Sequence, residues 1–217
     1  MEDLIGGNDI KYLDSKNTTQ TGFGWKELFT FPIDDHKQTK ARNALSVIAS
    51  FISHVDNFDG NQRLLCLDNN PTQSLSNKLI DSKPYQKTHD SCKGYPFAYI
   101  HDVGGTLGYG WNIQHKDFYP NYMDLTQWSE APVWGDVSNC EVTVHAIPGC
   151  SWNGNLVVSE EGREFAAELL SQLTDKQISD LFTVARVNLM RGDAINDWIN
   201  GFKDKMEKDI FNTQCGK

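Results

Sequence analysis

The pattern of apolar and polar residues predicts one long, buried helix over residues 37–54. Apolar residues recur there at steps of three and four, which is the spacing of one helix face. The positions that form this face are Ala41, Ala44, Leu45, Ile48, Phe51 and Ile52, and Val47, Ala49 and Val55 widen it. A polar stretch begins directly at His54. A rigid helix that ends there should hold the polar stretch in a fixed place.

Two short apolar runs downstream predict a β-hairpin with a long insertion. Residues 64–67 read Leu-Leu-Cys-Leu, and residues 96–101 read Pro-Phe-Ala-Tyr-Ile-His. Such runs are typical of strands. Residues 68–93 between them are polar, so we expect an exposed excursion that adds little to the core. Pairing of the two strands should bring Asn61, before the first strand, near Asp102, after the second.

The second half of the chain predicts a body of three helices. Apolar residues recur at helical spacing in residues 160–173, 178–187 and 195–206. The side chains expected to be buried on these helices are Phe165, Ala166, Leu169, Leu170, Leu173, Leu181, Phe182, Ala185, Ile195, Trp198, Ile199, Phe202 and Met206. Residues 1–24 and most of 111–148 lack a clear period, so we expect irregular structure there, apart from a strand over 141–146. Together these elements predict an α+β fold that is mainly helical.

Polar residues at the helix starts predict how each helix is capped. Ser159 should be an N-cap, because its hydroxyl can accept from a backbone N–H of the first turn. Thr174 and Gln177 have the spacing of a capping box. Asp193 is expected to cap the last helix.

Composition and charge exclude some functions. The chain has 217 residues, 39% of them hydrophobic, and a formal net charge of −9. A net negative charge argues against a general nucleic-acid binder, because phosphate backbones are bound by clustered Lys and Arg. No run approaches the ~20 apolar residues that a membrane span requires. The first residues show no signal peptide, so we expect either a cytoplasmic protein or one whose leader has been removed.

The five cysteines leave the redox state open. Cys66 and Cys92 flank the polar insertion, and Cys140 and Cys150 flank a short strand-and-turn segment, so two disulfides with Cys215 left over are one interpretation. Those pairs would imply an extracytoplasmic, periplasmic or secreted protein. Free thiols in a cytoplasmic protein are the alternative. The cysteines lie far apart without a C-x-x-C pair, which argues against a zinc site.

Two polar turns carry the candidate chemistry. The first places His54, Asp56 and Asn61 at the spacing His-x-Asp-x-x-x-x-Asn, and the second is Asp102-Val103-Gly104. Carboxylates and an amide on rigid turns can hold a divalent cation and orient a hydroxyl group. Phosphoryl transfer depends mainly on such positioning and charge neutralisation. The alternative is that these residues only cap turns, as Asp and Asn commonly do.

The order of helix, first turn, strand, excursion, strand and second turn resembles the lower lobe of an atypical protein-kinase-like fold. This branch includes lipid-kinase-like enzymes, HipA-type toxins and secretory-pathway kinases. The blocks NQRL-x-C-L and HD-x-G-x-T-x-G also resemble a set of uncharacterised bacterial proteins. The resemblance implies a kinase-like C-lobe over residues 37–217, with a small β-hairpin that carries the site and a C-terminal three-helix body. Residues 1–36 would form an entry segment.

The resemblance also implies roles for individual residues. Asp56 would be the catalytic base or orienting group, and His54 would brace the loop. Asn61 and Asp102 would hold magnesium or manganese. The remaining two candidates, which would contact phosphate or metal, are Asn57 and Gln62.

The kinase-like interpretation leaves several alternatives open. Residues 1–36 are too few for an upper lobe and contain no Gly-rich loop with a strand Lys. The chain is therefore expected to be the C-lobe of a longer enzyme, to receive the missing half from a protein partner, or to be a non-catalytic pseudokinase. A fourth alternative is a disulfide-stapled extracytoplasmic interaction module without a nucleotide site.

Overall fold

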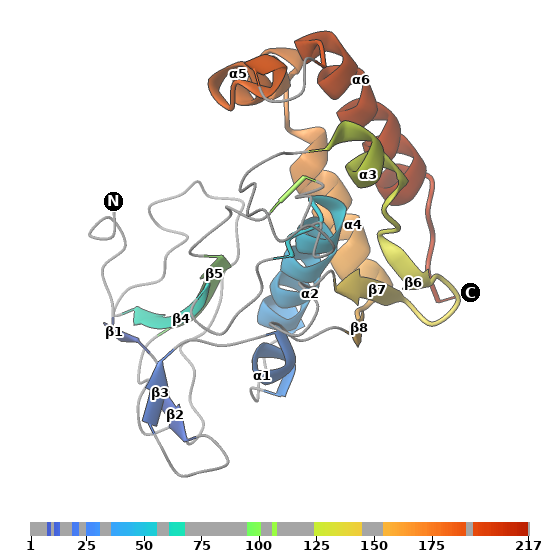
Figure 1. The fold of residues 1–217 in the computed structure, drawn as a ribbon. Helices are drawn as coiled ribbons and strands as arrows, with labels where there is room; N and C mark the ends of the chain where they lie inside the picture. The colour runs from blue at the N-terminus through green and yellow to red at the C-terminus, as the bar shows by residue number, and fades with distance from the viewer. Residues whose placement is uncertain are drawn as a thin grey trace, which may run out of the picture. The chain divides into compact units, whose positions relative to one another are not determined.

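The fold is α+β, as the sequence predicted. The computed structural model describes residues 8–9, 11–13, 19–21, 25–30, 36–55, 61–67, 95–100, 106–107, 124–144, 154–189 and 193–216 (Figure 1). The chain divides into two compact units, each formed by two separate segments of the sequence. Unit 1 comprises Met1–Arg42 and Asn57–Val103, and unit 2 comprises Asn43–Asp56 and Gly104–Lys217.

Unit 1 contains two small antiparallel sheets. The elements are β1 (Asn8–Asp9), β2 (Lys11–Leu13), β3 (Thr19–Thr21), α1 (Trp25–Thr30), the first turns of α2 (His36–Phe51), β4 (Gln62–Leu67) and β5 (Tyr95–Ile100). One sheet has the strand order β1-β4-β5, and the other is the β2–β3 pair. The expectation of irregular structure over residues 1–24 was wrong at these three strands. They are too short to show a period, and β1 exists because β4 offers it a pairing edge.

The predicted hairpin is confirmed. Strands β4 and β5 pair antiparallel from Gln62 opposite Ile100 to Leu67 opposite Tyr95. Four consecutive residues of β4, from Leu64 to Leu67, are buried, as expected for the central strand of a sheet. The predicted excursion over residues 68–93 lies outside the described residues.

Unit 2 contains the helical body. Its elements are the rest of α2, α3 (Leu125–Glu130), β6 (Trp134–Asp136), β7 (Glu141–Val144), β8 (Gly154–Val157), α4 (Glu160–Ser171), α5 (Asp175–Val184), the 3-10 turn Val187–Leu189, α6 (Ile195–Met206) and a π-helical turn, Glu207–Phe211. Strands β6, β7 and β8 form one antiparallel sheet. The three C-terminal helices are those that the sequence predicted. Figure 1 shows α3 (olive) running beside α6 (red).

An aromatic cluster joins these helices in the core of unit 2. Trp128 of α3 stacks on Trp198 of α6, with ring centroids 6.0 Å apart, and meets Phe51 of α2 edge-on at 5.7 Å. Phe182 of α5 and Phe202 of α6 complete the cluster. All five side chains are at most 4% exposed. Helix α3 was not predicted, because only Trp128 of its six residues is buried and no periodic pattern could appear.

Two of the three predicted helix caps are confirmed. The Ser159 hydroxyl accepts from Gly162 N at 3.1 Å, and Thr174 forms the full capping box with Gln177. The prediction for Asp193 was wrong: α6 begins at Ile195, and its N-cap, Ala194, makes no side-chain hydrogen bond. Asp193 therefore lies one residue too early to act as the N-cap.

The burial prediction failed at Leu173 and Leu181, which are 36% and 49% exposed. Leu173 lies beyond the end of α4 at Ser171. Ile178 and Phe182, four residues apart, form the buried line of α5. Leu181 precedes Phe182 by one residue and so lies about 100° away around the helix. Helix α5 also ends at Val184, three residues earlier than predicted, and Arg186 just beyond it adopts a φ of 54°.

None of the helices within the described ranges is long and apolar enough to cross a membrane.

Candidate functional site

The end of α2 is a well-defined cap that positions His54. Ser53 adopts the left-handed conformation with a φ of 50°. Its N–H donates to Ser50 O, and the next N–H, of His54, donates to Ala49 O, both at 2.9 Å. These two bonds form a Schellman motif, which satisfies carbonyls that the helix end would leave unpaired. Helix α2 therefore stops abruptly just before the first predicted polar turn.

Two groups from later in the chain satisfy the remaining carbonyls of this helix end. The indole N–H of Trp128 donates to Phe51 O at 2.7 Å, and this hydrogen bond is buried. The backbone N–H of Leu107 donates to Ile52 O, also at 2.7 Å. The last turn of α2 is thus held by its own cap, by α3 and by the segment at Leu107, all within unit 2.

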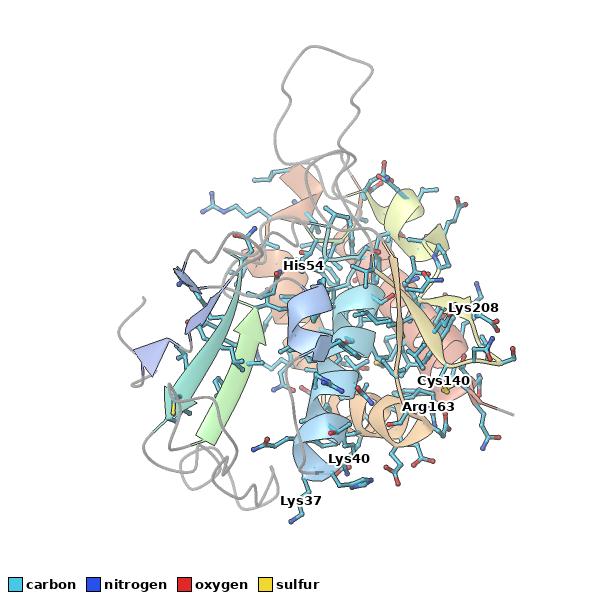
Figure 2. The ribbon with its side chains drawn as sticks, turned by 90° about the horizontal axis from the view of Figure 1, so that it is seen from below. Lys37, Lys40, His54, Cys140, Arg163 and Lys208 are labelled. Atoms are coloured by element: carbon cyan, nitrogen blue, oxygen red, sulfur yellow. A yellow bond between two sulfur atoms is a disulfide. The ribbon has the colours of Figure 1, made fainter. Side chains whose placement is uncertain are left out.

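His54 itself is buried, with 2% of its surface exposed (Figure 2). A histidine that is this buried cannot contact a solvent-borne substrate with its ring, but it can brace the backbone of a loop. The bracing role expected for His54 stays a prediction. The next two candidate residues, Asp56 and Asn57, lie outside the described residues.

Asn61 and Gln62 mark the start of β4 in unit 1. Gln62 is 3% exposed and pairs with Ile100, the last residue of β5. The end of β5 that leads toward Asp102 therefore lies beside the start of β4. Asp102 itself lies outside the described residues.

The candidate phosphoryl-transfer residues are divided between the two units. His54 and Asp56 belong to unit 2, whereas Asn61, Gln62 and Asp102 belong to unit 1. Their convergence on a shared metal ion stays a prediction.

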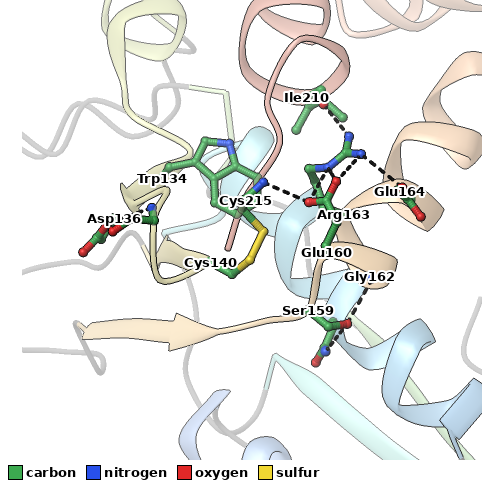
Figure 3. Close-up of a disulfide and its surroundings, with 12 residues drawn as sticks. Trp134, Asp136, Cys140, Ser159, Glu160, Gly162, Arg163, Glu164, Ile210 and Cys215 are labelled. Carbon is green, nitrogen blue, oxygen red and sulfur yellow. Dashed lines mark hydrogen bonds and ion pairs between the residues drawn. A yellow bond between two sulfur atoms is a disulfide. The ribbon is translucent and has the colours of Figure 1, made fainter. Parts of the chain in front are cut away.

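A second cluster of reactive groups lies entirely within unit 2, around a disulfide between Cys140 and Cys215 (Figure 3). The predicted Cys140–Cys150 pair was therefore wrong. The two bonded cysteines are 75 residues apart, and the fold brings the C-terminal tail to the start of β7. Closeness in sequence had suggested the wrong partner. Cys66 is also disulfide-bonded, with its partner outside the described residues, so Cys66–Cys92 stays a prediction.

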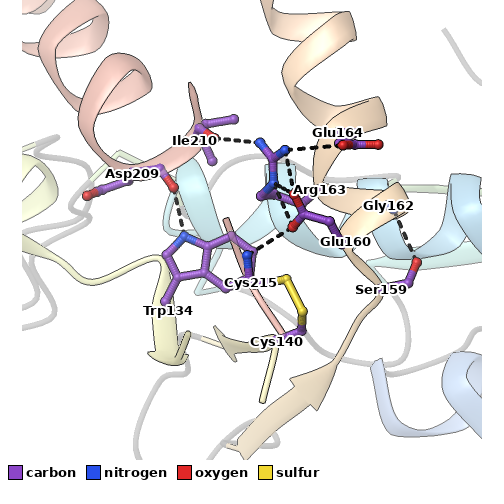
Figure 4. A network of polar contacts seen from close by, with 10 residues as sticks. All are labelled: Trp134, Cys140, Ser159, Glu160, Gly162, Arg163, Glu164, Asp209, Ile210 and Cys215. Atoms are coloured by element: carbon purple, nitrogen blue, oxygen red, sulfur yellow. Dashed lines mark hydrogen bonds and ion pairs between the residues drawn. A yellow bond between two sulfur atoms is a disulfide. The ribbon is translucent and has the colours of Figure 1, made fainter. Parts of the chain in front are cut away.

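A partly buried ion pair lies next to this disulfide (Figure 4). Arg163 Nε donates to both carboxylate oxygens of Glu160 at 2.9 Å, and Arg163 Nη1 donates to Ile210 O, also at 2.9 Å. The carboxylate of Glu160 accepts in turn from the backbone N–H of Cys215 at 3.0 Å. Arg163 is only 8% exposed, and its charge is compensated by Glu160, by backbone oxygen and by the Glu164 carboxylate, 3.9 Å from Arg163 Nη2.

The sequence contained a signal for part of this cluster that the prediction did not use. Glu160 and Arg163 are three residues apart on one helix, which places them on the same face and predicts an ion pair. Nothing local pointed to Cys215, which reaches the cluster only through the tertiary fold.

The π-helical turn holds further polar contacts near the cluster. Trp134 Nε1 donates to Asp209 O at 2.7 Å, and the Asp209 carboxylate pairs with Lys205 at 3.0 Å. Lys205 is 3% exposed and also donates to Ala131 O, at the end of α3. Burial lowers the pKa of Lys205 below its ordinary value, while Asp209 partly offsets that shift. These contacts tie α3, β6 and α6 together and are best explained as structural.

Comparisons of the chain with protein-family models, with curated proteins and with solved structures each returned no match.

Proposed function

We propose that this chain carries the metal- and nucleotide-binding part of an atypical kinase-like phosphotransferase. The reaction would transfer a phosphoryl group from ATP, with magnesium or manganese, to a hydroxyl acceptor. The observation that carries the proposal is the register of β4 and β5. Gln62, the first residue of β4, lies opposite Ile100, the last residue of β5. Asn61 and the segment that leads to Asp102 are therefore connected to the same end of this strand pair.

Each candidate residue has a role that its chemistry allows. Asn61 and Asp102 supply oxygen ligands of the kind that Mg²⁺ prefers. Asp56 follows the rigid end of α2 and would orient the acceptor hydroxyl. The roles of the other three come from the resemblance: His54 would brace the loop, and Asn57 and Gln62 would contact phosphate or metal.

The covering half of a kinase would come from a longer chain or from a protein partner. A pseudokinase that keeps the fold without transferring phosphate is the non-catalytic version of the same proposal. The two versions differ in turnover but share the metal site.

Calorimetric titration of the full chain with ATP, in the presence of Mg²⁺ or Mn²⁺, tests the proposal. We expect metal-dependent binding that is lost in Asp102→Ala and in Asn61→Ala. Loss of an outer-shell partner alone costs about 10–100-fold in metal affinity, so loss of a direct ligand should cost at least as much. Asp204→Asn, at an exposed position of α6, is the control and should bind like the wild type. Equal affinity in the wild type and in Asp102→Ala would contradict the proposal.

A second candidate is a disulfide-stapled extracytoplasmic interaction module with no nucleotide site. It is favoured by the disulfide at Cys140 and Cys215 and by the bonded state of Cys66, because stable disulfides are typical of oxidising compartments. Intact mass after thiol alkylation, with and without prior reduction, counts the disulfides of the native protein. Two disulfides together with no detectable nucleotide binding would favour this module over the kinase-like site.

A further inference from the structure

We propose that reduction of the Cys140–Cys215 disulfide converts this cluster into a site for one thiophilic divalent cation. The ligands would be the two sulfur atoms and the carboxylate of Glu160. One donor atom from each of these residues lies within 4.8 Å of the other two. Zinc and its chemical relatives accept sulfur and carboxylate ligands in tetrahedral sites, and three protein ligands leave the fourth position for water.

The backbone around the two cysteines is held by contacts that do not depend on the disulfide. Cys140 N donates to Val137 O at 3.2 Å, and Val158 N donates to Cys140 O at 2.9 Å. In the C-terminal tail, Gly216 N donates to Val137 O at 3.0 Å, and Cys215 N donates to the Glu160 carboxylate. Reduction removes one covalent bond but leaves these hydrogen bonds in place. The two sulfurs therefore stay within reach of one ion.

Glu160 is already oriented as a metal ligand of this kind usually is. Carboxylate ligands are commonly fixed by hydrogen bonds from outer-shell partners. Arg163 and the N–H of Cys215 supply these bonds to the Glu160 carboxylate.

The charges also balance. Two thiolates and Glu160 carry three negative charges, and the buried guanidinium of Arg163 returns one positive charge. A divalent cation brings the cluster to neutrality, which matters because Cys140 and Cys215 are at most 6% exposed.

The chemical step needs a reductant, and a dithiol serves as one. The dithiol attacks the disulfide and leaves as a cyclic disulfide, and its two electrons and two protons produce two cysteine thiols. The cation then displaces both thiol protons as the sulfurs bind it. A cyclic disulfide of the same class reverses the sequence: it accepts two electrons and two protons to become the dithiol, the Cys140–Cys215 bond re-forms, and the ion is released. The absence of a C-x-x-C pair does not exclude such a site, because its ligands come from three separate parts of the chain.

Cadmium ion is the probe, because cadmium bound to thiolate produces a charge-transfer band in the ultraviolet. The full chain is reduced with a phosphine, which does not chelate the metal, and is then titrated without oxygen. We expect one Cd²⁺ more per reduced chain than in the double variant Cys140→Ser, Cys215→Ser. The oxidised wild type should lack this ion. Glu160→Gln should weaken the site by at least about tenfold, as expected for a lost ligand. Cys150→Ser is the control and should keep the full stoichiometry.

Thiol alkylation followed by peptide mass spectrometry gives a readout that needs no variant. In the reduced wild type, Cd²⁺ should slow alkylation of Cys140 and Cys215 together. Equal alkylation rates with and without Cd²⁺, or equal Cd²⁺ stoichiometry in the wild type and the double variant, would overturn the proposal. Either result leaves the nucleotide proposal untouched, because no residue is shared between the two sites.

Discussion

Replacing Trp128 with Phe is expected to loosen the helix end that carries His54. The substitution keeps an aromatic ring in the core of unit 2 but removes the indole N–H. That N–H donates to Phe51 O at 2.7 Å, in a fully buried position. The carbonyl cannot turn to water, since Phe51 is also fully buried. Trp128→Phe therefore leaves Phe51 O as a buried acceptor without this donor.

The magnitude follows from two terms. Leaving a buried polar group without its partner costs about 1–3 kcal/mol. The smaller ring of Phe leaves part of the indole volume empty, which adds about 1 kcal/mol on the scale of measured cavities. We therefore expect Trp128→Phe to lower the free energy of unfolding by about 2–4 kcal/mol.

Trp198→Phe is a matched control, because it makes the same change in the same cluster. Trp198 is 1% exposed and stacks on Trp128, but its indole N–H has no hydrogen-bond acceptor within the described part of the chain. Trp198→Phe therefore carries the cavity cost without the cost of a lost hydrogen bond, and it removes a buried donor that has no acceptor among the described residues. Its cost should therefore be smaller by about 1–3 kcal/mol, the contribution of the hydrogen bond.

Urea unfolding of both variants under oxidising conditions, followed by tryptophan fluorescence and circular dichroism, measures the difference. Comparable m-values would show that the same transition is being compared. If Trp128→Phe proves no more destabilising than Trp198→Phe, the assignment of the Trp128 hydrogen bond as a clamp on α2 is wrong.

Three further perturbations test other parts of the fold. Gly162→Ala should destabilise the fold by about 1–3 kcal/mol, as overpacked cores do, because the new Cβ would overlap Asn43 Cβ. Thermal denaturation should show a clearly smaller loss for the control Gly201→Ala, whose new Cβ meets only the end of a movable side chain. Cys215→Ser removes a disulfide that closes a loop of sequence separation 75, and loop entropy predicts a loss of about 4 kcal/mol in the free energy of unfolding. Unchanged stability in urea unfolding would show that the disulfide adds nothing to the hydrogen bonds that hold the tail. Hydrogen bonds from Ser138 and then from Asn139 lower the pKa of Asp136 below its ordinary value, so the charged carboxyl stabilises the fold above that value. The stability difference between wild type and Asp136→Asn should be full at neutral pH and shrink as the pH falls through the acidic range, and a difference independent of pH would refute it.

The sequence alone determined the elements whose signals are local. The period of apolar residues identified α2, α4 and α6. In α2 the predicted face was only partly right, because the polar Asn43, Ser46 and Ser50 are buried while Leu45 and Ile48 are half-buried. The caps at Ser159 and Thr174 were readable because the cap and its acceptor N–H lie within one turn. The hairpin of β4 and β5 followed from two matching apolar runs. These features need no knowledge of distant parts of the chain.

Only the tertiary structure decided the features that join distant residues. The partner of Cys140 was Cys215 and not the nearby Cys150, because the tail returns to the start of β7. The hydrogen bond from Trp128 to the end of α2 spans 77 residues of sequence and has no local signature. Strand β1 and helix α3 were missed for the same reason: each is too short to carry a period, and contacts with other elements stabilise it. The spacing of His54, Asp56 and Asn61 predicts a shared site, but side chains on separate turns meet only if the packing of distant segments brings them together.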